Sequence, residues 1–350
     1  ALRSDPIKVK MIKESQRLLN MKRRYYRYFV CVCVLLYIYY YFGVGDYMLA
    51  KSYDDFDYPL NVDVRPLVRK VLSGGKASMA PINYYPYRFL TNSAKCKTIE
   101  RLDLFIVIKS ALTHFGHRDA IRRTYGQENL IPGRIVKTLF FLGMDSPPKS
   151  ETQSRIEDEM AEYKDIIQID FHDDYYNSTI KTMMSFRWVF EHCATADYYL
   201  FTDDDMYVSV DKVDSTLTGS QSTEEHLFAG YLFDSSPQRF RSSKWRVTLE
   251  EYPWDRWPPY ITGGAYVVSN ISMKYLYIGS LFVKHFKFDD VYLGIVAKKV
   301  GLEPRHSANF HYYKKHYSKE EYRDVIASHG YSNHEEMIRI WNEQNSVNRV

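Results

Sequence analysis

The chain has few cysteines and a small net charge. The first limits the possible disulfides, and the second argues against a nucleic-acid-binding protein. The 350 residues include four cysteines; Cys31 and Cys33 fall in an apolar N-terminal segment, so Cys96 and Cys193 are the only pair left for the rest of the chain. The formal net charge is +4, much of it from the first 27 residues. A balance this modest gives no reason to expect a nucleic-acid partner. No internal repeat is evident.

Two common binding loops are also missing. Gly75-Lys76-Ala77 is not a phosphate loop, because the upstream glycine and the hydroxyl residue after the lysine are absent. The acidic run at 203–205 fits an EF-hand poorly, because Val208 stands where that loop needs a glycine. The sequence therefore argues against both loops.

The N-terminal segment has the features of a membrane anchor. Residues 28–44 carry no charge, and as a helix they extend roughly 25 Å. Residues 1–27 are rich in lysine and arginine, whereas acids dominate just after the apolar segment, so the positive-inside rule puts the N-terminus in the cytosol. A cleaved signal peptide is the alternative, but no clear small-residue cleavage site follows. We expect a type II signal anchor, and the short span hints at the Golgi membrane.

Three features of the remaining chain are consistent with a position in the lumen. In an oxidising lumen two thiols of one domain usually pair, so we expect a disulfide between Cys96 and Cys193. Asn177-Ser178-Thr179 and Asn270-Ile271-Ser272 are acceptor sequons for N-glycosylation. Prolines and glycines interrupt every apolar run of residues 45–95, which predicts a stem or linker with little packed structure. Residues 96–350 are then the luminal domain.

Strand and helix signals alternate from Cys96 onward. Short apolar runs predict buried strands at 102–108, 137–143, 166–171 and 197–201. Helices are expected from 117, over 150–163, over 179–193, and from 288 to a C-cap at Gly301. This alternation predicts an α/β fold with a mostly parallel sheet and helices on both faces.

Three consecutive carboxylates, Asp203-Asp204-Asp205, follow the apolar run 197–201. They repel one another unless a cation lies among them, and hard divalent cations prefer oxygen ligands. At the carboxyl end of a strand in an open α/β sheet, where ligands bind, such a cluster suggests a metal that holds a diphosphate. A solvated acidic turn is the alternative, and the triplet alone leaves both open.

Seven motifs in order resemble those of the β-1,3-glycosyltransferases of the galactosyltransferase and N-acetylglucosaminyltransferase type, more distantly related to Fringe. One such motif is weak support, but seven in the same order are strong support. The matching residues are 118–126, 140–143, 165–171, 174–182, the acidic triplet, 257–266 and 289–294.

The resemblance implies a GT-A type fold, a UDP-sugar donor and a divalent cation, usually manganese. Asp205 is then expected to ligate the metal. Asp203 and Asp204 are expected either to support it from the second coordination shell or to bind the ribose. Arg122 resembles a contact to the donor phosphates, because a guanidinium binds phosphate oxygens in pairs; a surface arginine on a helix is the alternative. Gly263 and Gly264 are expected to let the backbone approach the donor sugar.

The resemblance also implies inversion at the anomeric carbon, so one carboxylate must accept the proton of the acceptor hydroxyl. Asp290 is the first choice for this base and Asp289 the second. Both acids could instead be helix caps, because the dipole favours acids in a first turn. For a further metal ligand the family offers a late histidine. His311 is the first choice, with His306 and His316 as alternatives.

The expected function is β-1,3 transfer of a hexose, galactose first, from a UDP-sugar to a glycan of a glycoprotein or glycolipid in the Golgi. Transfer of N-acetylglucosamine or N-acetylgalactosamine from the corresponding UDP-N-acetylhexosamine is the alternative. A non-catalytic glycan-binding or chaperone relative is a second alternative. A dead copy is expected to lose the acidic triplet or the late acidic pair, and this chain keeps both.

Overall fold

The computed structural model describes residues 6–97, 99–146, 150–218 and 226–348. The chain divides into two compact units. Unit 1 consists of Ala1–Phe56 and Ser236–Arg256, and unit 2 of Asp57–Ser235 and Trp257–Val350.

Unit 1 contains the helices α1 (Pro6–Tyr41) and α2 (Val44–Met48) and the 3-10 turn η1 (Tyr53–Asp55). Gly43 links α1 to α2 with a φ of 64°, and a β-carbon there would come within 2.5 Å of the Arg239 carbonyl oxygen, so only glycine suits the position. The segment expected to span a membrane, residues 28–44, is helical as far as Tyr41. Within the described ranges, no helix combines the length and the apolar character that a membrane span requires.

Unit 2 is built on a seven-stranded sheet with the order β3-β2-β1-β4-β7-β6-β8. The first four positions form a parallel half, as the sequence predicted, and β7 runs antiparallel to both β4 and β6. The strands are β1 (Leu102–Lys109), β2 (Val136–Met144), β3 (Ile166–His172), β4 (Ala196–Asp203), β6 (Phe228–Phe233), β7 (Tyr260–Ser269) and β8 (Arg305–His306).

A second, three-stranded sheet in unit 2 has the order β5-β10-β9. Its strands are β5 (Tyr207–Val208), β9 (Phe310–His311) and β10 (Ala327–Ser328). β5 begins four residues after the end of β4, so the acidic triplet lies at the junction of the two sheets.

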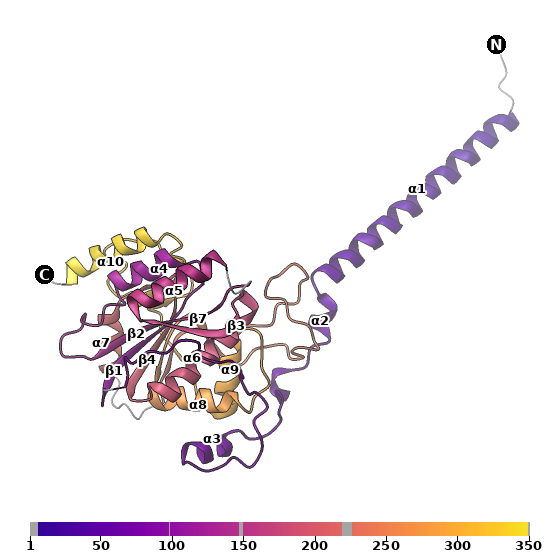
Figure 1. Ribbon diagram of the computed structural model, residues 1–350. Coiled ribbons are helices and arrows are strands. Elements are labelled where there is room, and N and C mark those ends of the chain that lie inside the picture. Colours follow the sequence, from indigo (N-terminus) through magenta and orange to yellow (C-terminus); the bar gives the residue numbers. More distant parts are fainter. Residues whose placement is uncertain (1–5, 98, 147–149, 219–225, 349–350) are drawn as a thin grey trace. The chain divides into compact units, whose positions relative to one another are not determined.

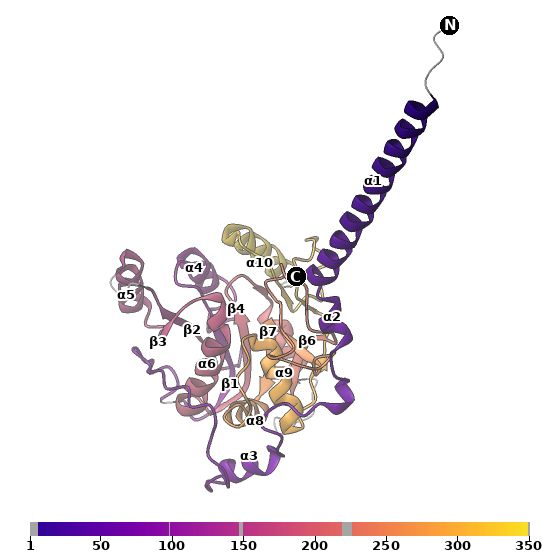
Figure 2. The ribbon, with the colours of Figure 1, turned by 90° about the vertical axis from the view of Figure 1, so that its right-hand side faces the viewer.

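Helices cover both faces of the large sheet, and this prediction is confirmed (Figures 1 and 2). One face carries α4, α5 and α10, and the other carries α6, α8 and α9. β1 shows why both are covered: Ile106 belongs to the core that includes Ile121 of α4, whereas its neighbour Phe105 stacks on Trp188 of α6 at 5.9 Å between ring centroids. Alternate side chains of a strand point to opposite faces, so a fully apolar strand needs a cover on each. The helices are α3 (Arg65–Leu72), α4 (Phe115–Arg123), α5 (Glu151–Tyr163), α6 (Ser178–His192), α7 (Val210–Thr218), α8 (Asn270–Ser280), α9 (Asp289–Val300) and α10 (His334–Asn348), with the 3-10 turn η2 (Tyr175–Asn177) before α6.

Residues 57–95 differ from the loosely packed stem that the sequence predicted. They belong to unit 2, where α3 packs against α8 and buries Leu67 and Val68. Further along, the Asn83 amide donates to the Ser280 carbonyl at 2.7 Å. The prolines do not disrupt this packing, because Pro66 stands in the first turn of α3, where a missing N–H costs nothing.

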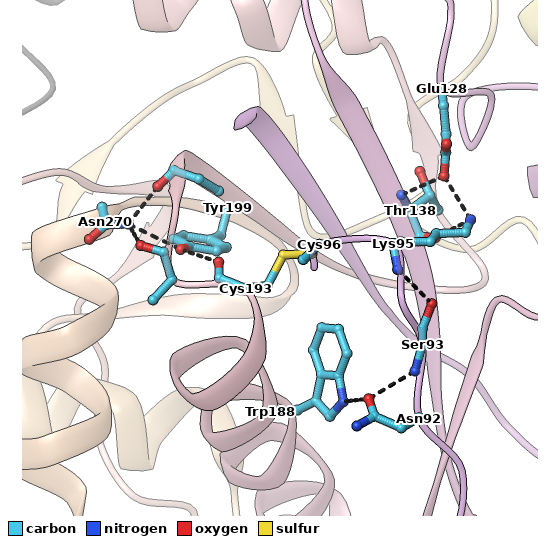
Figure 3. The surroundings of a disulfide bond; sticks show 12 residues. Asn92, Ser93, Lys95, Cys96, Glu128, Thr138, Trp188, Cys193, Tyr199 and Asn270 are labelled. Atoms are coloured by element: carbon cyan, nitrogen blue, oxygen red, sulfur yellow. Dashed lines mark hydrogen bonds and ion pairs between the residues drawn. A yellow bond between two sulfur atoms is a disulfide. The ribbon is translucent and has the colours of Figure 1, made fainter. Parts of the chain in front are cut away.

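The predicted disulfide between Cys96 and Cys193 is confirmed, with 5.3 Å between the Cα atoms (Figure 3). It ties the segment before β1 to the residue that ends α6. Asn270, an expected glycosylation site, lies in the same region. Its amide nitrogen donates to the carbonyls of Ala194 and Ala196 and to the Tyr199 hydroxyl (Figure 3). In the folded protein this nitrogen is therefore occupied.

Candidate active site

The candidate site lies where β1 and β4 end, β7 begins and α9 starts. Lys109 is the last residue of β1 and pairs in register with Asp203, the last residue of β4. α9 begins at Asp289 because Phe288 is extended, and it ends at Gly301 in the left-handed conformation, the C-cap expected from the sequence. The two acidic motifs, far apart in the sequence, are thereby brought to one edge of the sheet.

Lys109 joins the two acidic motifs directly. Its ammonium nitrogen lies 3.1 Å from a carboxylate oxygen of Asp203 and 2.8 Å from one of Asp289, and it donates to the Gly263 carbonyl at 3.2 Å. The side chain is only 6% exposed. Burial lowers the pKa of Lys109, but the two carboxylates outweigh burial and hold that pKa well above its usual value. Lys109 is therefore a fixed positive charge between two acids.

The acidic pair at the start of α9 is split into two different environments. Asp289 accepts hydrogen bonds from Lys109 at 2.8 Å and from the Thr182 hydroxyl at 2.7 Å. Burial acts to raise the pKa of Asp289, but Lys109 outweighs it and leaves that pKa below its usual value. Asp290 has no such cation within the described residues and accepts only the Val291 N–H. Burial and the charge of Asp289 raise the pKa of Asp290 to about 7.

Within the acidic triplet, Asp204 has a structural role. Its carboxylate accepts hydrogen bonds from the Ser110 hydroxyl at 2.6 Å and the Ala111 N–H at 3.0 Å, and it lies 3.0 Å from Nδ1 of His114. Burial raises the pKa of Asp204, but His114 and these hydrogen bonds leave it below its usual value. Asp204 thus fixes the loop after β1. Burial raises the pKa of the first acid, Asp203, to about 6 even though Lys109 acts against the rise.

Asp205, the last acid of the triplet, faces a histidine that the sequence reasoning missed. Its carboxylate lies 3.3 Å from Nε2 of His329, and both side chains are partly exposed, at 30% and 40%. The contact is held by backbone pairing, because β10 pairs with β5 and the Tyr331 N–H donates to the Asp205 carbonyl at 2.8 Å. A usable signal was present: one hydroxyl residue, Ser328, separates His329 from the apolar run 325–327, just as Thr202 separates the triplet from the run 197–201.

The three histidines considered from the sequence are not brought to Asp205. His311 lies in β9, beside β10, and its ring contacts that of Tyr313. His306 packs against Tyr231, and His316 is exposed. Among the described residues, no group of three or more histidine, cysteine, aspartate or glutamate side chains is arranged to hold a metal ion. Asp205 and His329 supply two possible ligands, one oxygen and one nitrogen.

Arg122 lies away from the site. Its guanidinium bonds to Asp165 at 2.8 Å and Glu159 at 2.7 Å, and it stacks on Tyr163 at 3.9 Å. Asp165 precedes β3, whose first residue Ile166 pairs with Phe140 of β2, so this network lies beside the outer strands β2 and β3 rather than at Lys109. The expected phosphate contact is thus not supported, because these carboxylates already satisfy the guanidinium.

The two glycines lie between the acidic pair and the histidine. A β-carbon on Gly263 would come 3.4 Å from a carboxylate oxygen of Asp289, and one on Gly264 would come 3.5 Å from the His329 ring. Gly263 and Gly264 therefore border the site; that they let the backbone approach the donor sugar stays a prediction. Both distances are van der Waals contacts, so the absence of side chains at these glycines leaves space between the acidic pair and His329.

Two comparisons with known proteins agree on one family, and the chain belongs to it. The galactosyltransferase family profile matches residues 116–308. The chain is 40% identical to "Beta-1,3-galactosyltransferase brn" of Drosophila melanogaster over 296 residues, which cover 84% of this chain and 87% of that one. It is 36% identical to "Beta-1,3-galactosyltransferase 1" of Mus musculus over 284 residues, 80% of this chain and 85% of that one. A solved glycosyltransferase involved in glycosylation of the PBCV-1 major capsid aligns with a TM-score of 0.37 at 10% identity, covering 69% of this chain and 99% of that one, a likeness too low to add weight.

Proposed function

Because this chain belongs to the galactosyltransferase family, we propose that it transfers galactose from UDP-galactose to a glycan hydroxyl in β-1,3 linkage, with inversion and with the help of a divalent cation. The relatives named above are β-1,3-galactosyltransferases. The observation that carries the proposal is the junction at Lys109, which draws the acidic triplet and the acidic pair to one edge of the sheet. We also propose that unit 2 has a GT-A type fold.

Asp290 is the proposed base. In an inverting transfer the acceptor oxygen bonds to the anomeric carbon as the bond from that carbon to the diphosphate oxygen breaks, and UDP leaves with the electron pair. The hydroxyl proton goes to a carboxylate, and a pKa near the working pH suits that task. Asp290, with its pKa raised to about 7, meets this requirement. Asp289 is held as an anion by Lys109 and Thr182 and positions the start of α9.

Asp205 and His329 are the proposed metal-binding residues. A carboxylate oxygen and an imidazole nitrogen suit manganese, and because both side chains are partly exposed, a diphosphate can complete the ligand set. When bound, the cation supplies Lewis-acid stabilisation of the charge on the departing diphosphate. Asp204 supports Asp205 by fixing the preceding residue to the loop after β1.

The proposed place of action is the Golgi lumen, with residues 28–44 as a type II anchor. The disulfide between Cys96 and Cys193 supports an oxidising compartment. The basic character of residues 1–27 supports a cytosolic N-terminus.

The test is turnover by the full-length protein purified in detergent, with UDP-galactose, UDP-N-acetylglucosamine and UDP-N-acetylgalactosamine as donors. We expect UDP-galactose to give the highest kcat/KM, and chelator to abolish turnover until manganese is restored. Asp205→Ala and His329→Ala should each lower turnover by about 10²-fold or more, whereas His311→Ala should change it little. A preference for either N-acetylhexosamine would reassign the donor, and no turnover with any of the three would indicate a non-catalytic relative.

A further inference from the structure

A row of five aromatic side chains, Tyr231, Phe233, Tyr260, Tyr312 and Tyr313, crosses the surface beside the candidate site; we call it the aromatic row. Tyr260 of β7 stacks on Phe233 of β6 at 5.9 Å between ring centroids. Phe233 meets Tyr312 at 4.7 Å, and Tyr312 meets Tyr313 at 5.1 Å. Tyr231 contacts both Phe233 and Tyr312. Each ring therefore contacts at least one other, from Tyr260 to Tyr313.

The aromatic row is open to solvent. Tyr312 and Tyr313 are 44% and 47% exposed, and the other three are partly exposed. Within the described residues, the hydroxyls of Tyr231, Tyr312 and Tyr313 make no hydrogen bond to protein. Large exposed aromatic patches usually mark a binding surface. One that combines ring faces with unused hydroxyls suits a ligand with apolar faces and many hydroxyls of its own.

One end of the aromatic row lies against α9, which carries the acidic pair, and the other end adjoins Asp205 and His329. At one end, a β-carbon on Gly294, in the second turn of α9, would clash with Tyr260, so Tyr260 lies against the helix that begins with Asp289 and Asp290. Burial, and after it the negative charge of Asp290, raises the pKa of Tyr260 to about 12. The acceptor hydroxyl must reach Asp290, so the acceptor must lie beside this end.

The other end of the aromatic row adjoins the proposed metal-binding residues. Tyr312 directly follows His311, whose carbonyl accepts the His329 N–H at 3.1 Å. His329 in turn faces Asp205. A ligand lying along the row is thus flanked by the proposed base at one end and the proposed metal-binding residues at the other.

We propose that the aromatic row is the binding surface for the acceptor glycan, whose sugar rings pack their C–H faces on Tyr312, Phe233 and Tyr260 and place the reacting hydroxyl at Asp290. This inference rests on the proposed function and names the surface that its acceptor uses. C–H groups are attracted to the negative face of an aromatic ring, and the free tyrosine hydroxyls can bond to sugar hydroxyls.

The test compares Tyr312→Ala with Tyr312→Phe in the full-length protein, and Tyr84→Ala, another exposed tyrosine, is the matched control. Binding of a free disaccharide acceptor without donor is followed by saturation-transfer NMR. Acceptor KM, donor KM and acceptor-free hydrolysis of UDP-galactose are measured in parallel.

We expect Tyr312→Ala to weaken disaccharide binding and raise acceptor KM about tenfold, equivalent to ~1.4 kcal/mol. Donor KM and donor hydrolysis should stay unchanged, Tyr312→Phe should remain within about threefold of wild type because it keeps the ring, and Tyr84→Ala should match wild type. Unchanged disaccharide binding in Tyr312→Ala overturns the inference, and so does an effect seen only with a glycoprotein acceptor, which indicates a protein contact. The two proposals can also fail separately. If wild type binds the disaccharide and Tyr312→Ala does not, but wild type fails to turn over UDP-galactose, the binding surface is supported and the proposed function is rejected.

Discussion

The charges around Asp290 predict that the pH profile of transfer can be moved in opposite directions by two substitutions. As the proposed base, Asp290 must be ionised, so kcat/KM for the acceptor should rise with pH and reach half its plateau near pH 7. The charge of Asp289 raises the pKa of Asp290, and that of Lys109 lowers it. Asp289→Asn should therefore move the midpoint to lower pH, and Lys109→Met should move it to higher pH.

The size of the shift follows from Coulomb's law. At a separation of about 6 Å and an effective dielectric constant of about 20, one unit charge contributes about 3 kcal/mol, or about two pKa units. The site is partly exposed, so we expect a shift of at least about one unit for each variant. Lys109→Met also leaves Asp203 and Asp289 without their cation, and removing one partner of a buried pair costs about 3–5 kcal/mol of stability. Asp289→Asn keeps the shape and an acceptor oxygen, so it is the milder change.

The assay measures kcat/KM for the acceptor from pH 5 to 9 at saturating UDP-galactose and manganese. Thermal unfolding of each variant shows that the protein measured is folded. Lys137→Met is the matched control, because Lys137 also forms a lysine–carboxylate pair, with Glu128 at 2.6 Å, on the neighbouring strand; its midpoint should equal that of wild type. Equal midpoints in all four proteins, or shifts of the same sign in both test variants, would refute the electrostatic reasoning. Complete loss of transfer in folded Asp289→Asn would make Asp289 the base instead.

Three further predictions concern the base, the glycan and the disulfide. Asp290→Asn should lower turnover by roughly 10²–10⁴-fold, while binding of UDP and manganese, measured by calorimetry, stays close to wild type; if Asp290→Asn and Asp289→Asn both stay active, the pair is only a helix cap. Asn177→Gln should remove the mobility shift that an N-glycosidase causes, because the hydrogen bonds of the Asn177 amide to His172 and Asp174 are exposed. Asn270→Gln should leave the shift and lower the melting temperature, because Asn270 donates to Ala194 and Ala196 in a partly buried position. Cys96→Ser should cost about 2–5 kcal/mol of unfolding free energy in denaturant titrations, since the bridge closes a loop across 97 positions; an unchanged midpoint would show that the bridge does not form.

The central strands and the disulfide could be predicted because their signals are local or exclusive. β1 to β4 are short apolar runs with polar ends, and each was placed within two residues of its observed bounds. Cys96 had one possible partner outside the apolar N-terminal segment. The antiparallel course of β7 was not predicted, because strand direction depends on the length and path of the connection from β4, which residue patterns do not show.

The packing of residues 57–95 and the role of Arg122 depend on partners distant in sequence. Leu67 and Val68 are only two apolar residues among prolines and charges until α8 is placed beside them. Arg122 sits in a motif shared with the family, but its function in the structure follows from Glu159 and Asp165, which lie 37 and 43 positions away. A guanidinium that binds phosphate and one that binds carboxylates look the same in a sequence, because both need only a planar array of donors.

Strand register explains why His329 rather than His311 meets Asp205. In the small sheet, His311 of β9 pairs with Ser328 of β10, so these two side chains share one face. His329 is one residue further and points to the opposite face, where Asp205 lies beside the end of β4. A slip of one residue in this pairing would exchange the faces and leave Asp205 without a histidine. The histidine that we propose as a metal ligand is therefore selected by a two-residue strand pairing, a signal too short to read from residue types. A substitution that shifts this pairing should abolish the proposed metal binding without changing Asp205 or His329.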